Sequence, residues 1–248
     1  MNSPQLTLMA DDEAGTPLSR TEQAYERIRL EILTFGLLPG ELVSEISLAE
    51  RFELSLAGVR AAVPRLRHEG LFINKKRHGQ MVSPVTLEEI DNTYELRYLL
   101  EPRAAEQAVG NVDVEALRAL DKRAGAWTLA GDRPSKLEAM FAHRQFHLAI
   151  AAACRNEQLA QWIGHLVDKV LRFQYLDLRS SQAGGLDWSA NHAGIISALD
   201  EGDPKQAADA MRQDISNGRE LVLQAALGLP EFRKLNLGGG DSVISRPT

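Results

Sequence analysis

The chain has 248 residues, of which 44% are hydrophobic and 25% charged, a composition typical of a soluble protein with one large or two small domains. It contains no run of about 18 apolar residues that would predict a membrane span, and its N-terminus lacks the basic and apolar regions of a secretory signal. Its single cysteine, Cys154, cannot form an internal disulfide, which favours a cytoplasmic location. The formal net charge of −6 argues against nucleic-acid binding unless the basic residues are concentrated in one region.

The first predicted element is a helix that follows a flexible arm of residues 1–18. Between residues 19 and 36 the apolar side chains recur at helical spacing, and Gly36 is expected to end the helix. Pro39 and Gly40 then predict a turn, because proline fixes φ and glycine permits a positive value. The apolar stripe of this helix consists of Ala24, Ile28, Ile32 and Phe35.

Two further helices are predicted before residue 70. Ser47 and Glu50 have the spacing of a capping box, in which two side chains satisfy the free amides at a helix start. Another helix is expected to begin after Ser55 and to run to Gly70. Its inner stripe consists of Val59, Val63 and Leu66.

A basic hairpin completes the N-terminal region. Residues 71–82 are typical of two short strands around a basic tip, and the order of helices, turn and hairpin is that of a winged helix-turn-helix, whose second helix enters the DNA major groove. Residues 55–80 hold six Lys or Arg against one acid, Glu69, which indicates an anion-binding surface, although a solvated run of charge is the alternative. The candidate DNA contacts are Ser55, Arg60, Arg65, Arg67, Lys75, Lys76, Arg77, His78 and Gly79.

The chain from residue 85 onward is predicted to be helical almost throughout. Thr86 and Glu89 form a capping box before a first helix, and residues 113–131 form a second. Ser135 and Glu138 are expected to open a third helix.

Three more helices are predicted after that. Two amphipathic segments cover about residues 157–180 and 188–200, and Asp203 is expected to cap a last helix, with Pro204 at its first position, that ends near Leu227. The predicted fold class is therefore mostly α, with a flexible arm at 1–18, a winged helix-turn-helix at 19–84, an all-helical bundle at 85–229 and a flexible tail at 230–248.

Four polar residues fall on apolar helix faces of the predicted bundle. His143 and His147 are four residues apart, so their rings can converge, and His192 and Asp214 lie on the inner stripes of the last two helices. A buried carboxylate without a partner is costly, and a divalent cation such as zinc, nickel, iron or manganese would remove that cost. Satisfied core histidines are the alternative, because the sequence cannot show that three helices converge.

The chain as a whole resembles a known family over about residues 20–228. PGELVSEISLAERFELSLAGVRAAVPRLRHEGLF is similar to the DNA-binding domain of GntR-family transcription regulators. The second half resembles the all-helical FCD ligand domain of the FadR-like branch, in the segments ELRYLLEPRAAEQA, FHLAIAAACRNEQL and DEGDPKQAADAM, the last preceded by His192.

The resemblance implies a metal site at His143, His147, His192 and Asp214. The family has Asp where this chain has His143, and His where it has Asp214, so that the exchange preserves a set of three His and one carboxylate. Arg97 occupies a position that often holds an effector carboxylate, and a salt bridge within the bundle is its alternative role.

Two positions depart from the DNA-binding pattern of the family. Leu56 replaces an arginine that commonly reads the groove, and Pro64 lies inside the reading helix, where we expect a kink or an early end.

The resemblance implies a cytoplasmic, homodimeric transcription regulator and not an enzyme. It would bind a palindromic operator in double-stranded DNA, under the control of a small carboxylate effector held at a divalent transition metal. A metal-dependent enzyme built on the same four ligands, or a regulator whose metal is purely structural, are the alternatives.

Overall fold

A computed structural model describes residues 18–76, 79–125, 133–179 and 192–228. The chain divides between Pro84 and Val85 into two compact units. Within the described residues, no helix combines the length and the apolar character needed to cross a membrane. Residues 1–17 of the predicted arm, the predicted tail, Arg77, His78 and residues 126–131 of the helix predicted at 113–131 lie outside the described residues.

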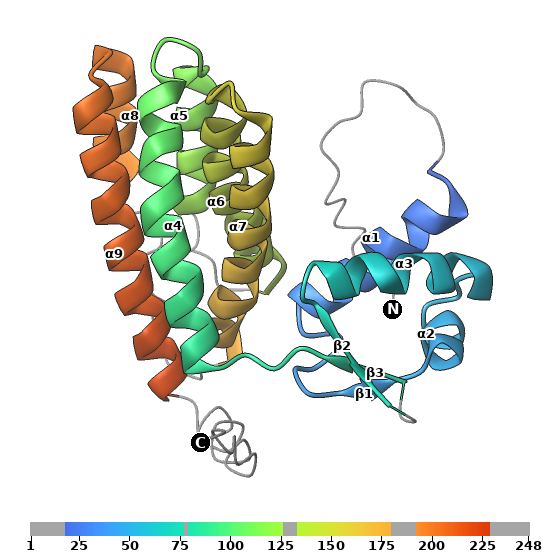
Figure 1. Ribbon diagram of the computed structural model, residues 1–248. Coiled ribbons are helices and arrows are strands. Elements are labelled where there is room, and N and C mark those ends of the chain that lie inside the picture. Colours follow the sequence, from blue (N-terminus) through green and yellow to red (C-terminus); the bar gives the residue numbers. More distant parts are fainter. Residues whose placement is uncertain (1–17, 77–78, 126–132, 180–191, 229–248) are drawn as a thin grey trace, which may run out of the picture. The chain divides into compact units, whose positions relative to one another are not determined.

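The first unit is a winged helix-turn-helix (Figure 1). A three-stranded antiparallel sheet in the order β1-β3-β2 accompanies its helices, and α3 packs against α1. The sheet was predicted only in part, because β1 has two residues and leaves no periodic signal. The elements are α1 (Arg20–Leu33), β1 (Leu42–Val43), α2 (Glu45–Arg51), α3 (Leu56–His68), β2 (Phe72–Lys75) and β3 (Gly79–Val82).

Serine side chains begin all three helices of this unit. Ser55 caps α3 as predicted, since its Oγ accepts from the backbone N–H of Gly58 at 3.1 Å. The predicted start of α2 was wrong by three residues, because Ser44 rather than Ser47 is the cap and the two serines form the capping box together.

Two expectations about helix ends in this unit also need correction. Helix α1 ends at Leu33, and the positive φ that turns the chain is at Phe35, 54°, rather than at Gly36. Helix α3 does not end early at Pro64, because it continues to His68. Its inner stripe of Val59, Val63 and Leu66 is fully buried, as predicted, so packing against α1 holds the helix together across the proline.

Gly79 has a structural role in the sheet. Its φ is 84°, and a Cβ added there would lie 2.5 Å from the carbonyl oxygen of Val43 in β1. Any other residue would therefore push β1 and β3 apart. Gly79, one of the candidate DNA contacts, is thus also required for strand packing.

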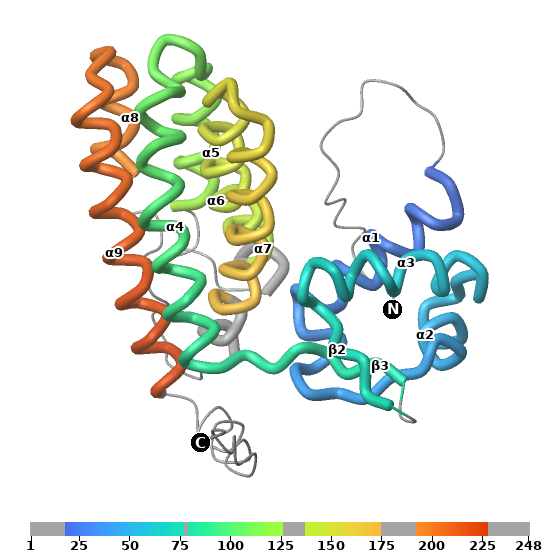
Figure 2. Tube along the Cα trace, in the orientation of Figure 1, coloured from blue at the N-terminus to red at the C-terminus, as the bar shows by residue number. Residues whose placement is uncertain are grey.

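The second unit is a bundle of helices around one apolar core. Figure 2 shows α4 and α9 running side by side in opposite directions, and Arg219 of α9 pairs with Asp91 of α4 at 2.7 Å. The elements are α4 (Leu87–Ala108), α5 (Val114–Gly125), α6 (Arg133–Ala153), α7 (Glu157–Arg179), α8 (His192–Glu201) and α9 (Pro204–Gly228).

Capping residues explain most of the helix starts in the bundle. Thr86 accepts from the N–H of Glu89 at 3.0 Å, and Asp203 accepts from the N–H groups of Lys205 and Gln206 at 3.0 Å, both as predicted. The predicted cap at Ser135 was wrong, because α6 already begins at Arg133.

Candidate metal centre

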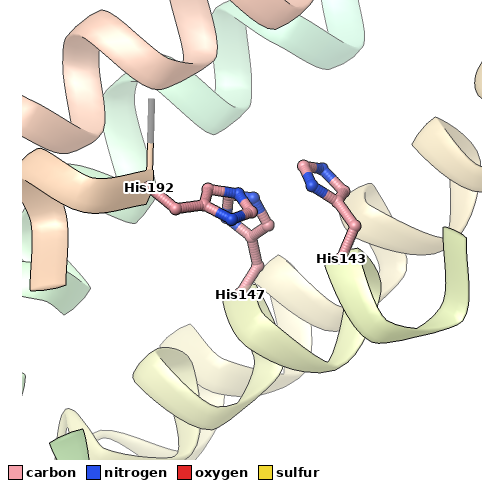
Figure 3. A group of neighbouring side chains, drawn as sticks. All are labelled: His143, His147 and His192. Carbon is pink, nitrogen blue, oxygen red and sulfur yellow. The ribbon is translucent and has the colours of Figure 1, made fainter. Parts of the chain in front are cut away.

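Three helices bring four polar side chains together inside the bundle. His143 and His147 lie one turn apart on α6, His192 is the first residue of α8, and Asp214 lies in the middle of α9. All four are buried, with 0–6% of each residue exposed. Figure 3 shows the three imidazoles gathered between α6 and the start of α8. The convergence that the resemblance implied is therefore present in the structure.

The facing atoms have the separations of a metal site rather than of hydrogen bonds. One ring nitrogen from each histidine lies within 4.8 Å of the other two. The carboxylate oxygens of Asp214 lie 3.6 Å from His147 Nε2 and 3.9 Å from His192 Nε2, which is too long for a hydrogen bond. Ligand atoms that share one ion at about 2.2 Å are at most about 4.4 Å apart, so a small side-chain movement would bring these atoms into range.

The facing nitrogen atoms lack partners in the part of the chain that the structure describes. Nδ1 of His143 and Nε2 of both His147 and His192 are buried without a hydrogen bond. An unpaired buried polar atom costs about 1–3 kcal/mol, and three of them face one point. Nitrogen and carboxylate donors in this set suit a divalent transition metal, so the residues fit the ion that the sequence implied.

Outer carboxylates fix the orientation of two of the rings. His147 Nδ1 lies 2.8 Å from Glu101 Oε2, and His192 Nδ1 lies 2.9 Å from Asp121 Oδ1. A carboxylate accepts only from a protonated ring nitrogen, so Nδ1 carries the proton and Nε2 presents its lone pair to the centre of the site. Phe146 stacks on a face of the His192 ring, with a centroid distance of 4.0 Å.

The charge beside the site is balanced by Arg97. This residue is 2% exposed and forms an ion pair with Glu101 on the same helix, and its Nη2 lies 3.4 Å from His147 Nδ1. Burial alone would raise the pKa of Glu101, but Arg97 and His147 outweigh it and hold that pKa at about 2. Glu101 is therefore a permanent anion behind His147.

His143 is held neutral by its surroundings. Burial, followed by the neighbouring His147, His192 and Arg97, lowers its pKa well below the usual value for histidine. Neutral imidazole is the form that binds a metal, so His143 needs no proton release before it can act as a ligand.

Sequence reasoning missed both outer carboxylates, and the two differ in how they could have been found. Glu101 follows Arg97 by four residues, a spacing that marks an ion pair on a helix. Asp121 has no such local signal, because its partner His192 is 71 residues away.

The predicted DNA contacts fall into two groups in the first unit. Arg60, with 62% of its side chain exposed, together with Arg67, Lys75 and Lys76, faces solvent as a DNA contact must. Arg65 is also exposed, with 52% of its side chain accessible, but it is held against α1, because its guanidinium covers the ring of Tyr25 at 3.4 Å and contacts Glu22 of α1 at 3.1 Å.

Two family models match the chain. The one described as "Bacterial regulatory proteins, gntR family" matches residues 20–82, and the one described as "FCD domain" matches residues 92–217. The HTH-type transcriptional repressor GlaR of Escherichia coli is 26% identical over 220 residues, which cover 82% of this chain and 96% of the relative. The uncharacterized HTH-type transcriptional regulator YdhC of Bacillus subtilis is 26% identical over 163 residues, covering 65% of this chain and 73% of the relative.

Solved structures agree with these matches at the level of the fold. E. coli McbR/YncC superimposes with a TM-score of 0.72 at 21% identity, over 84% of this chain and 99% of the other. A GntR transcriptional regulator from Rhodococcus sp. RHA1 gives a TM-score of 0.68 at 18% identity, over 84% and 99% of the two chains. Together with a winged helix-turn-helix and a helical bundle with a buried polar centre, these matches establish that the chain belongs to the GntR family, carries an FCD domain and is a DNA-binding transcription regulator.

Proposed function

We propose that this regulator controls transcription in response to a small organic acid bound at a divalent transition metal in the helical bundle. The observation that carries the proposal is the set of three buried imidazole nitrogens without partners, which face the buried carboxylate of Asp214. His143, His147, His192 and Asp214 would hold the ion. When bound, the ion would offer its remaining coordination positions to the oxygen atoms of the acid.

Arg97 is proposed as the second contact for the carboxylate of the acid. Its guanidinium is buried beside His147 and carries a permanent charge, because Glu101 and Tyr94 more than offset the effect of burial and raise its pKa. The same guanidinium already pairs with Glu101. An acid bound there would therefore share Arg97 with Glu101 and would alter the support of His147, which gives the ligand a physical route to the metal ligands.

The DNA function is proposed to be repression by a homodimer on a palindromic operator. Two relatives, GlaR and RspR of Escherichia coli, are named transcriptional repressors, and helix-turn-helix dimers read two half-sites related by symmetry. Exposed Arg60 would contact bases, and Lys75 and Lys76 would contact phosphates. The acid would change DNA affinity only to the extent that it binds one arrangement of the two DNA-reading units better than another.

The test combines metal analysis with operator binding. Gently purified full-length protein should contain about one divalent transition metal per chain, and His147→Ala protein should contain none. An operator is then selected from random DNA, and its affinity is measured against a panel of small mono- and dicarboxylic acids, with and without a chelator. We expect at least one acid to change operator affinity by fivefold or more, which is the usual range of allosteric coupling, and only in metal-loaded protein.

The other outcomes separate the alternatives. Protein without metal, and without a thermal shift on adding zinc, nickel or manganese, would contradict the metal centre. Metal-loaded protein that binds DNA but responds to no acid would indicate a structural metal. Turnover of an acid would indicate an enzyme. Arg60→Ala should weaken operator binding by about 1–3 kcal/mol, and unchanged affinity would contradict its role.

A further inference from the structure

The exposed residues in the first three turns of the reading helix offer few hydrogen-bonding groups to DNA. Over the first three turns of α3 the exposed residues are Ala57, Arg60, Ala61, Pro64 and Arg65. Arg65 is directed towards α1, where it contacts Tyr25 and Glu22. Arg60 is therefore the single remaining donor among these five side chains. Two alanine methyl groups lie beside it, that of Ala57 three residues before it and that of Ala61 one residue after it.

The start of α2 continues this apolar surface. Glu45 contacts the side chain of Arg60 at 3.4 Å, which shows that the first turn of α2 lies beside the outer face of α3. Ile46, the next residue, is 57% exposed. Leu56, the first residue of α3, is partly exposed. Neither Ile46 nor Leu56 can recognise a base edge through hydrogen bonds.

We propose that this regulator recognises thymine bases through their C5-methyl groups, by contact with Ala57 and Ala61 on the exposed face of α3. In the major groove, thymine is the base that presents a methyl group, and alanine is a side chain that contacts it. Small side chains also let the helix approach the base edges closely. Arg60 supplies the hydrogen-bonding contact between the two alanines. The proposal rests on the DNA-binding function and goes beyond the control by metal and acid.

The chemistry of the wing supports this division of roles. Lys75 and Lys76 are exposed at the end of β2 and suit phosphate oxygens, which carry no sequence information. Among the described residues of the winged helix-turn-helix, sequence discrimination then rests mainly on α3. A surface with one donor and several methyl groups also discriminates by apolar contact, so removing a methyl group from the DNA should lower the affinity measurably.

The test uses deoxyuridine, which differs from thymidine in that methyl group alone. An operator is selected from random DNA with the full-length protein, and each thymine of one half-site is replaced singly by uracil. We expect at least one replacement to weaken binding about fourfold, the equivalent of exposing one methyl group. In Ala57→Gly or Ala61→Gly protein, the affinity ratio between the thymine and uracil operators at that position should fall to about one.

The ratio makes the experiment independent of helix stability, because a glycine that weakens α3 lowers the affinity for both operators equally. Lys75→Ala is the matched control, and it should weaken binding to both operators while leaving the ratio unchanged. Uracil replacements without effect at every thymine would overturn the proposal. A fourfold ratio that persists in both glycine variants would assign the contact to other residues and would also overturn it. Protein that selects no sequence at all would instead contradict the DNA-binding function.

Discussion

The two units of this protein treat their functional side chains in opposite ways. In the winged helix-turn-helix, Arg60, Arg67, Lys75 and Lys76 are exposed, so that water can reach their charges when DNA is absent. In the helical bundle, His143, His147, His192 and Asp214 are buried, and three of their nitrogen atoms have no partner among the described residues. The DNA unit is therefore complete without its ligand, whereas the bundle is incomplete.

This difference separates binding from stability. A surface charge contributes about 0–1 kcal/mol to folding, so DNA-contact residues can be replaced with little effect on the folded state. A buried polar group without a partner lowers the stability of the unit that contains it, and a ligand that satisfies the group restores that stability. Loss of DNA contacts should thus change affinity alone, while loss of the metal centre or its support should change the stability of the bundle.

The largest effect is expected for Glu101→Gln. The buried guanidinium of Arg97 would lose its charged partner, and breaking a buried ion pair in this way costs about 3–5 kcal/mol. Glu106→Gln is the control on the same helix, since its partner Arg103 is 58% exposed and the pair should contribute about 0–1 kcal/mol. Denaturant unfolding of metal-free protein measures both variants. Equal losses would mean that the charge of Glu101 does not support Arg97.

The next largest effect is the loss of metal stabilisation. A metal present at about 100 times its dissociation constant stabilises the folded bundle by about 2.7 kcal/mol, which corresponds to a rise in melting temperature of about 5–10 °C. His147→Ala should abolish this rise. His165→Ala, a partly exposed histidine of α7 that lies against Trp162, should keep it. A chelator that leaves the melting temperature of the wild-type protein unchanged would contradict the metal centre.

The sequence predicts local features of this fold better than distant contacts. The caps at Ser55, Thr86 and Asp203 were predicted because a cap and the amide it satisfies are two or three residues apart. The start of α2 was misplaced because Ser47, which belongs to the true capping box with Ser44, also has an acid three residues later.

Long-range features depended on the resemblance or were not predicted. The spacing of His143 and His147 places them on one helix face, but only the family pattern linked them to His192 and Asp214. Asp121 was not predicted at all, because nothing local on α5 indicates that its carboxylate will meet His192 at the start of α8. Contacts of this kind are set by the packing of α5 against α8.

Asp121→Asn tests whether the outer carboxylate tunes the metal ligand. The asparagine oxygen can still accept from Nδ1 of His192, so the variant keeps the hydrogen bond and removes the charge. We expect metal affinity to fall about 10–100-fold, as measured by competition with a chelator, while the stability of metal-free protein changes little. Asp121 and Asp200 line one surface depression between α5 and α8, but Asp200 pairs with Arg118 and not with His192. Asp200→Asn is therefore the control. Similar losses in both variants would indicate a general charge effect.

The smallest effect is expected at Pro64, in the winged helix-turn-helix, where the functional side chains are exposed. Proline lacks the N–H that would bond to the carbonyl of Arg60, and in a regular helix interior it costs about 3 kcal/mol. Here α3 continues past it and its buried stripe holds the helix against α1, so part of that cost is already relieved. Pro64→Ala would restore a hydrogen bond that contributes about 1 kcal/mol to stability. It would also increase the conformational entropy of the unfolded chain, which lowers stability by about 0.4–1 kcal/mol. We therefore expect stabilisation below about 1 kcal/mol.

Ala61→Pro, on the same exposed face, should cost the full amount of about 3 kcal/mol, because nothing in the packing has adapted to it. Denaturant unfolding measures both variants. If Pro64→Ala stabilised the unit by as much as Ala61→Pro destabilised it, the buried stripe of α3 would not offset the hydrogen bond that is missing at Pro64.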